Sequence, residues 1–301
     1  EWLEAYGAVD FEPSRVHGEW ETSKQTVQKW LDEVFPEETM DELLTSTYKM
    51  ATSPADVVMK GQGWGALDNA IQESLGRKPI AEYLDFGALE EQQNVWMRFL
   101  KNGYLDCPDP KAAPASFIVQ NEWFELLKKA VKAADANNWY AWDNIGLCYF
   151  ARSLYKEALE AFEKSMALEQ STWGYHGLAN VWRVMGDEHL SAYLMAKARS
   201  LNPSDLALAK ETLRFAYEAG EYDLMNSVYD ELSAEQRKAP MIKAYHAFAL
   251  AHTGRPDDAL EILEENGGLE IPDLREGDNS LPNEFIFCKQ AIAAREGRTL
   301  R

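Results

Sequence analysis

Histidine, cysteine and carboxylate side chains could hold a metal or move a proton, and the chain has 5 His, 3 Cys and 50 Asp or Glu residues. The histidines show neither the HxxxH nor the HExxH spacing that is typical of zinc hydrolases. Cys107, Cys148 and Cys288 form no CxxC pair and have no histidine at ligand spacing, so they indicate neither a disulfide framework nor a zinc site. Among so many carboxylates, close pairs arise by chance. We therefore predict no metal, no catalytic residue and no enzymatic activity within this chain.

A glycine-rich segment, GQGWGA, starts at Gly61 and matches the GxGxxA pattern of dinucleotide-binding turns. Asp85 lies near the position where an acidic residue would bind the ribose. Only a short apolar run precedes the segment, and the sequence shows no β-α-β pattern around it. We interpret the glycines as a tight entry into a helix and predict no cofactor, although Trp64 is a candidate contact for a sugar or a neighbouring domain.

The charge balance restricts the possible partners. Acidic residues outnumber basic ones 50 to 30, which gives a net charge of −20. Such a surface repels phosphate backbones, so we expect no nucleic-acid partner. No apolar run approaches the roughly 20 residues that a membrane helix needs, so we expect no membrane partner. Because the chain begins at Glu1 without Met or a signal-like segment, we expect a piece of a longer, cytoplasmic polypeptide.

A repeat in the second half of the chain would position any binding residues. Ser153, Gly186, Gly220 and Gly254 are spaced 33, 34 and 34 residues apart. The clearest copy, residues 139–171, has apolar residues on one face of a first helix and small residues in a second. This pattern resembles the tetratricopeptide repeat, a helix-turn-helix unit of 34 residues that stacks into a solenoid.

We predict an all-α fold, a superhelical tetratricopeptide-repeat solenoid with an irregular helical cap before it and a capping helix after it. The tryptophan-rich cap covers residues 1–120, and the solenoid covers residues 121–264. Clear repeats are expected near 139–171, 172–205, 206–239 and 240–264, and a loop and the capping helix occupy 265–301. The alternative, an irregular helical bundle, would not keep one register through four copies.

The resemblance to tetratricopeptide repeats also implies a groove, because the first helix of each repeat lines the concave face in that family. Three cations, Arg183, Lys210 and Arg214, then face two acids, Asp143 and Glu218, which suggests a mildly basic groove for an acidic or polar partner segment. The alternative is that these cations pair with acids of adjacent repeats. The candidate groove residues are Tyr140, Phe150, Trp173, His176, Asn180, Arg183, Lys210, Arg214 and Tyr217.

Four segments, EWLEAYGAV, GQGWGAL, NNWYAWDNIGLCYF and PDLREGDNSLPNEF, resemble a family of large bacterial proteins. Those proteins join an N-terminal β-sandwich domain of unknown function to a C-terminal tetratricopeptide region. The resemblance implies that this chain is the repeat region alone, and that the sandwich is related to carbohydrate-active enzymes.

Two functions therefore stay open. The first is a non-catalytic scaffold that docks its own N-terminal domain or a partner protein. The second is an accessory part of a carbohydrate-active enzyme, in which Trp64 and other aromatic residues of the N-terminal half contact sugar. All ten tryptophans precede residue 183, either as core residues or as such a sugar platform.

Overall fold

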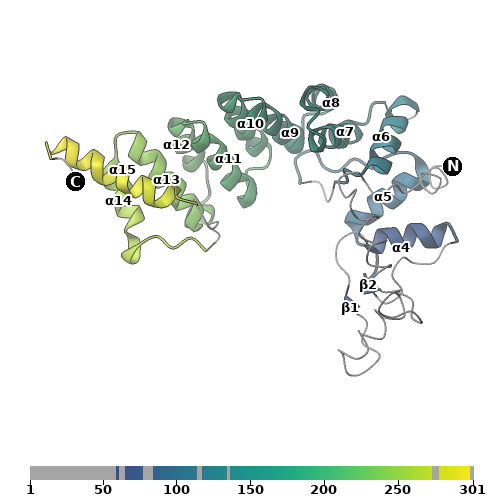
Figure 1. Ribbon diagram of the computed structural model, residues 1–301, viewed down its shortest axis with the longest axis horizontal. Helices are drawn as coiled ribbons and strands as arrows, with labels where there is room; N and C mark the ends of the chain where they lie inside the picture. The colour runs from purple at the N-terminus through teal and green to yellow at the C-terminus, as the bar shows by residue number, and fades with distance from the viewer. Residues whose placement is uncertain are drawn as a thin grey trace, which may run out of the picture. The chain divides into compact units, whose positions relative to one another are not determined.

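A computed structural model describes residues 59–60, 65–76, 84–113, 117–133, 136–272 and 278–298 (Figure 1). Trp64 and the helices expected within the first 58 residues lie outside the described residues. The chain divides into two compact units, Glu1–Cys107 with Ala115–Cys148, and Pro108–Pro114 with Tyr149–Arg301.

The first unit contains a short parallel strand pair that the sequence did not predict. Strand β1 (Met59–Lys60) pairs with β2 (Leu84–Asp85), with Met59 opposite Leu84, and helix α4 (Gly65–Ser74) lies between them in the chain. The expectation that no β-α-β pattern surrounds the glycine-rich segment was therefore wrong. The sequence signal is weak because each strand is only 2 residues long.

Buried aromatic residues form the centre of the first unit. Helix α5 (Glu91–Asn102) contributes Trp96 and Phe99, and helix α6 (Asn121–Ala133) contributes Trp123. The rings of Trp96 and Trp123 meet edge to face with their centroids 5.3 Å apart. Trp96 and Trp123 thus belong to the core.

Helix α7 (Trp139–Ala151) follows, and Asn138 caps it by accepting a hydrogen bond from the Ala141 N–H while donating another to the Leu105 carbonyl.

The second unit is a series of helices in which neighbours along the chain pack against each other (Figure 1). In chain order they are α8 (Tyr155–Leu168), α9 (Thr172–Val184), α10 (Glu188–Leu201), α11 (Leu206–Glu218), α12 (Tyr222–Asp230), the 3₁₀ turn η2 (Gln236–Lys238), α13 (Pro240–His252), α14 (Pro256–Leu263), the 3₁₀ turn η3 (Glu265–Gly267) and α15 (Ser280–Arg295).

The repeating turn residues adopt the same backbone conformation in every copy. Ser153, Gly186, Gly220 and Gly254 have φ values of 58°, 91°, 70° and 85°, in the left-handed region. At each turn the next residue donates its N–H to a carbonyl five residues back, as in the bond from Glu221 to Ala216. This hydrogen bond ends the first helix of each repeat and reverses the chain. The sequence period therefore reports a real structural period.

Polar N-caps begin three of these helices, and a glycine lets two of them pack closely. Ser171, Asp187 and Asp205 cap α9, α10 and α11, each by accepting a backbone N–H three residues ahead. Gly177 lets α9 approach α8, since a Cβ there would lie 2.4 Å from the ring of Phe162. These features make the fold an all-α tetratricopeptide-repeat stack, apart from the two short strands, as the sequence predicts.

The second compact unit includes residues 108–114 as well as the helices that follow Cys148. Residues 108–114 join the repeat stack because the N–H of Thr172 donates to the Pro110 carbonyl at 2.8 Å. The Thr172 hydroxyl donates to the Lys111 carbonyl at 3.0 Å. A long-range backbone contact of this kind leaves no periodic signal in the sequence.

Candidate functional site

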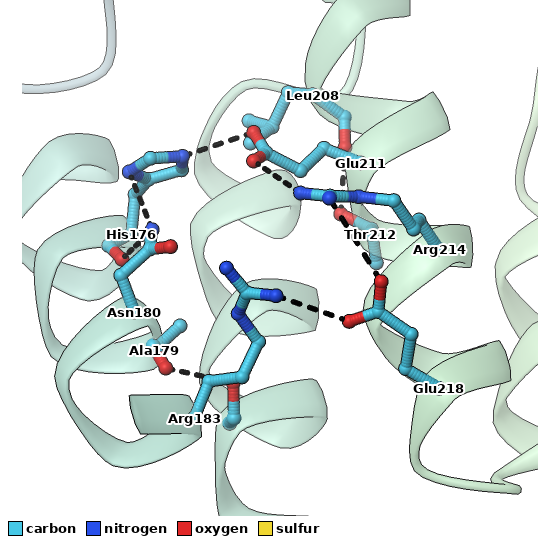
Figure 2. A network of polar contacts seen from close by, with 10 residues as sticks. His176, Ala179, Asn180, Arg183, Leu208, Glu211, Thr212, Arg214 and Glu218 are labelled. Carbon is cyan, nitrogen blue, oxygen red and sulfur yellow. Dashed lines mark hydrogen bonds and ion pairs between the residues drawn. The ribbon is translucent and has the colours of Figure 1, made fainter. Parts of the chain in front are cut away.

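The first helices of the second and third repeats, α9 and α11, are joined by paired polar side chains (Figure 2). Nε2 of His176 lies 2.9 Å from Oε2 of Glu211, and Nη1 of Arg183 lies 3.4 Å from Oε2 of Glu218. Both pairs span 35 residues, which is about one repeat. They belong to what we call the first-helix face, which is the face of α9 and α11 that bears Trp173, His176, Asn180, Arg183, Lys210, Glu211, Arg214 and Glu218.

Arg214 connects the two pairs within α11. Its guanidinium lies 3.2 Å from a carboxylate oxygen of Glu211 and 3.8 Å from one of Glu218. The guanidinium groups of Arg183 and Arg214 also lie over the ring of Phe215, 4.9 Å and 5.2 Å from its centroid. The two arginines are thus held in fixed positions by both charge and an aromatic ring.

This pairing changes the expected charge of the face. Glu211 was not among the predicted groove residues, yet it contacts both His176 and Arg214. Burial acts to raise the pKa of Glu211, but its hydrogen bond with His176 and the nearby charges bring the pKa below its ordinary value. Arg183 pairs with an acid of the next repeat, as the alternative interpretation proposed, whereas Arg214 pairs with acids of its own helix. The two arginines and two glutamates of the network therefore balance each other in charge.

The network leaves polar atoms accessible to a partner. The side chains of His176, Glu211, Arg183, Arg214 and Glu218 are between 16% and 37% exposed. Asn180 donates through Nδ2 to the carbonyl of His176, which holds its amide beside the imidazole. The face is therefore a partly exposed surface that offers both hydrogen-bond donors and acceptors.

Aromatic residues border the network at both ends. The ring of Trp173 lies against that of His176, with centroids 4.5 Å apart. At the end of α11, Tyr217 packs against Tyr245 and Phe248. Trp173 and Tyr217 are both half-buried, so the predicted aromatic residues lie beside the polar network.

The other predicted groove residues are placed differently. Tyr140 is only 4% exposed, so it is a core residue of the first unit and not part of an open surface. Phe150 packs its ring edge-on against Tyr155, with centroids 5.6 Å apart. Lys210 is half-buried on α11, and Trp64 lies outside the described residues. The position of a residue in the first helix of its repeat, which was the basis of these predictions, does not indicate whether its side chain stays exposed.

Asp143, which the sequence also placed in the groove, is buried like Tyr140. It is 1% exposed, and its Oδ1 has no hydrogen-bond partner among the described residues. Burial raises the pKa of this carboxyl to about 7. Asp143 thus weakens its own unit near neutral pH rather than attracting a partner.

A third inter-repeat contact lies at the end of the stack and involves the last helix. Glu284 of α15 is 6% exposed and accepts a hydrogen bond from the Tyr217 hydroxyl at 2.7 Å. Its other oxygen lies 2.8 Å from Nε2 of His252. The imidazole of His252 stacks between Tyr222 and Phe287, with centroids 4.1 Å from each. Residues of the third and fourth repeats are thereby fixed to α15, which the sequence predicted only as a cap.

Five of the ion pairs between repeats share one direction. In the pairs His176–Glu211, Arg183–Glu218, Arg199–Glu231 and His252–Glu284 the nitrogen side chain precedes the carboxylate by about one repeat. His189 and Glu221 follow the same rule. In these five pairs the earlier repeat supplies the nitrogen side chain and the later repeat or α15 supplies the carboxylate, whereas Arg295 of α15 and Asp257 of α14 have the opposite order.

Within the described residues, no group of three or more His, Cys, Asp or Glu side chains is arranged to hold a metal. In the same part of the chain, none of the helices is both long enough and apolar enough to span a bilayer.

Comparison with known proteins gives only distant structural likenesses. No protein-family model matches the chain, and neither does any curated protein. Among solved structures, MamA is similar at 16% identity and a TM-score of 0.41, over 70% of this chain and 96% of MamA. YrrB, described as a tetratricopeptide-repeat protein with an unusual peptide-binding site, is similar at 16% identity and a TM-score of 0.42, over 69% of this chain and 98% of YrrB. PilF from Pseudomonas aeruginosa is similar at 18% identity and a TM-score of 0.38, over 53% of this chain and 70% of PilF.

Proposed function

We propose that this chain is a non-catalytic protein-interaction module that binds a partner segment on the first-helix face of α9 and α11. The observation that carries the proposal is the partly exposed network of His176, Arg183, Glu211, Arg214 and Glu218. Side chains that are already held in place lose little conformational entropy when a partner binds. A set of donors and acceptors that is already in place thus favours the binding of a partner over a purely structural role.

The charge of the network defines the chemistry of the partner. Two arginines and two glutamates alternate on the face, so a segment with both donors and acceptors would be complementary. A strongly acidic segment would meet Glu211 and Glu218 as well as the net charge of −20 of the whole chain. We therefore propose a polar, neutral or mixed-charge partner segment, which keeps the polar and drops the acidic option of the segment that the sequence suggested.

Two sources for this segment follow from the resemblance to large bacterial proteins. The segment belongs either to a domain of the same polypeptide, such as the N-terminal β-sandwich, or to a second protein. The chain then acts as a scaffold that holds this domain or protein.

The test is site-specific photo-crosslinking on the first-helix face. A photoreactive amino acid in place of Asn180 should capture the N-terminal domain or one discrete protein. The matched control carries the same group at Tyr193 of α10, which is 54% exposed and lies outside the first-helix face. Reversing the charges with Arg183→Glu and Arg214→Glu should weaken the captured complex at least about tenfold. Equal capture from both positions refutes the proposal, and so does an affinity that the charge reversal leaves unchanged.

The sugar-contacting alternative is tested separately. Its main residue, Trp64, lies outside the described residues, while Trp96 and Trp123 are buried in the core of the first unit. A glycan-binding screen should give no signal that depends on Trp64. Specific binding that is lost in Trp64→Ala would favour the sugar-contacting function.

A further inference from the structure

Helix α15 is held by partly buried apolar residues and by one buried polar group. Of its 16 residues, only Glu284, Cys288 and Ala293 are buried, so it buries no large apolar side chain completely. Phe285 and Phe287 pack partly buried against the core, and Ile286 remains 52% exposed. A terminal helix that buries no large apolar side chain completely gains less from the hydrophobic effect than a fully packed helix does.

The buried carboxylate is unusual for a helix that serves only as a cap. Burying a charged group costs free energy unless dedicated partners compensate it, and an apolar residue would pack at lower cost. Glu284 has such partners in Tyr217 and His252. Tyr217 lies in the third repeat and His252 in the fourth, so the two repeats together bind one carboxylate.

The same site also contacts an aromatic ring three residues after the carboxylate. Phe287 stacks on the imidazole of His252, whose opposite face is covered by Tyr222. Residues three apart lie on the same side of a helix, so Glu284 and Phe287 reach this site together. The contact therefore defines a pattern, a helix with Glu followed three residues later by Phe.

The other polar attachments of α15 are exposed ion pairs. Lys289 pairs with Glu264 and Arg295 pairs with Asp257, and all four side chains are at least 40% exposed. Pairs of this kind contribute little to stability. The described part of the segment before α15 contains Asn266, Gly267 and Gly268 with positive φ, so it does not continue α14 into α15 as a rigid helix.

We propose that Tyr217, Tyr222 and His252 form a docking site for a partner helix with the pattern Glu-x-x-Phe, and that α15 is its displaceable internal occupant. This inference rests on the proposed interaction function and adds a second site to it. A partner helix that presents Glu and Phe in the same way competes with α15. The occupied site then keeps the chain from binding weaker sequences.

The first experiment opens the site in the full chain. Glu284→Arg places a cation against His252 and should release α15, whereas Glu296→Arg makes the same charge change at an exposed position of the chain. A labelled peptide of residues 279–298 should bind the Glu284→Arg chain at least about tenfold more tightly than the wild type or the control. A peptide with Gln in place of Glu284 should bind about tenfold more weakly.

A double variant identifies the site. Adding Tyr217→Phe to Glu284→Arg should remove most of the gain in peptide binding, because the hydroxyl that donates to the carboxylate is absent. Equal peptide affinity for the wild-type and Glu284→Arg chains would overturn the proposal. So would tight binding that ignores Tyr217→Phe.

A second measurement needs no variant. Excess unlabelled peptide added to the wild-type chain should speed amide hydrogen exchange in its own α15 and leave α10 unchanged. Unchanged exchange in α15 contradicts displacement. A wild-type dimer seen by light scattering, with α15 protected only in that dimer, would show that a second copy is the occupant and would also overturn the proposal. None of these assays involves Arg183 or Asn180, so failure here and failure of the first-helix face are separate results.

Discussion

Replacing Asp143 by Asn should stabilise the first unit most strongly near neutral pH. Burial raises the pKa of this carboxyl from 3.8 to about 7, so the folded chain binds the proton more tightly than the unfolded chain does. The favourable protonated state is fully populated below the unfolded pKa. Its contribution is lost progressively as the pH rises from 3.8 to about 7. Asn carries no charge at any of these pH values and avoids the loss.

The size of the effect follows from the shift in pKa. A shift of about 3 units corresponds to about 4 kcal/mol when the carboxyl is ionised. Between about pH 5 and pH 7.5 the wild type should lose about 2–3 kcal/mol through Asp143 alone. Other groups also titrate, so the informative quantity is the difference between wild type and variant at the two pH values.

Urea unfolding followed by tryptophan fluorescence measures this difference, because all ten tryptophans lie in the first 182 residues. Asp143→Asn should be more stable than the wild type by about 2–3 kcal/mol more at pH 7.5 than at pH 5. Asp223→Asn, an exposed aspartate of α12, is the matched control and should follow the wild type. If Asp143→Asn and wild type change in parallel with pH, the argument for a buried, proton-binding Asp143 is refuted.

Three further substitutions test the repeat stack by thermal or urea unfolding. Ser153→Gly should stabilise by about 0.5–1 kcal/mol, because Ser153 has a φ of 58° that glycine adopts without strain. Gly177→Ala should destabilise by about 1–3 kcal/mol, since the new Cβ would overlap the ring of Phe162. Glu231→Gln should cost about 1.5–3 kcal/mol, because it removes the charged partner of Arg199, whose side chain is 2% exposed, although Glu231 itself is 66% exposed.

Two of these substitutions have a control in the same fold. Gly220→Ser, at an equivalent turn, should destabilise because it introduces the strain that Ser153→Gly relieves. Glu235→Gln, at the exposed pair with Lys238, should change stability by less than about 1 kcal/mol. Similar costs for Glu231→Gln and Glu235→Gln would show that burial of Arg199 does not matter.

Local rules allowed most of the fold to be predicted from the sequence. The turn at Gly220 depends on the conformation of one residue, and the cap at Asp205 depends on an N–H three residues away. Both recur with the repeat, so their spacing reveals the stack. The strand pair of Met59 and Leu84 has no such signal, because two residues are too few for an alternating pattern.

The chemistry of the first-helix face was harder to predict, because it depends on which side chains meet across repeats. Glu211 was missed although it lies 35 residues after His176, since a register rule identifies positions and not partners. Tyr140 and Asp143 occupy predicted positions but are buried. The role of Glu284 depends on a contact with Tyr217 that spans 67 residues, which no periodicity reveals.

The common direction of the inter-repeat pairs means that the repeats cannot be exchanged freely. If the third repeat were deleted, the register would bring Tyr245 to the position of Glu211 and His252 to the position of Glu218. His176 and Arg183 would then both lose their carboxylates. A duplicated third repeat, by contrast, would bring its own Glu211 and Glu218 with it. The positions of the charged residues therefore require a particular order of repeats, and we expect the chain to tolerate an added copy of the third repeat more readily than its deletion.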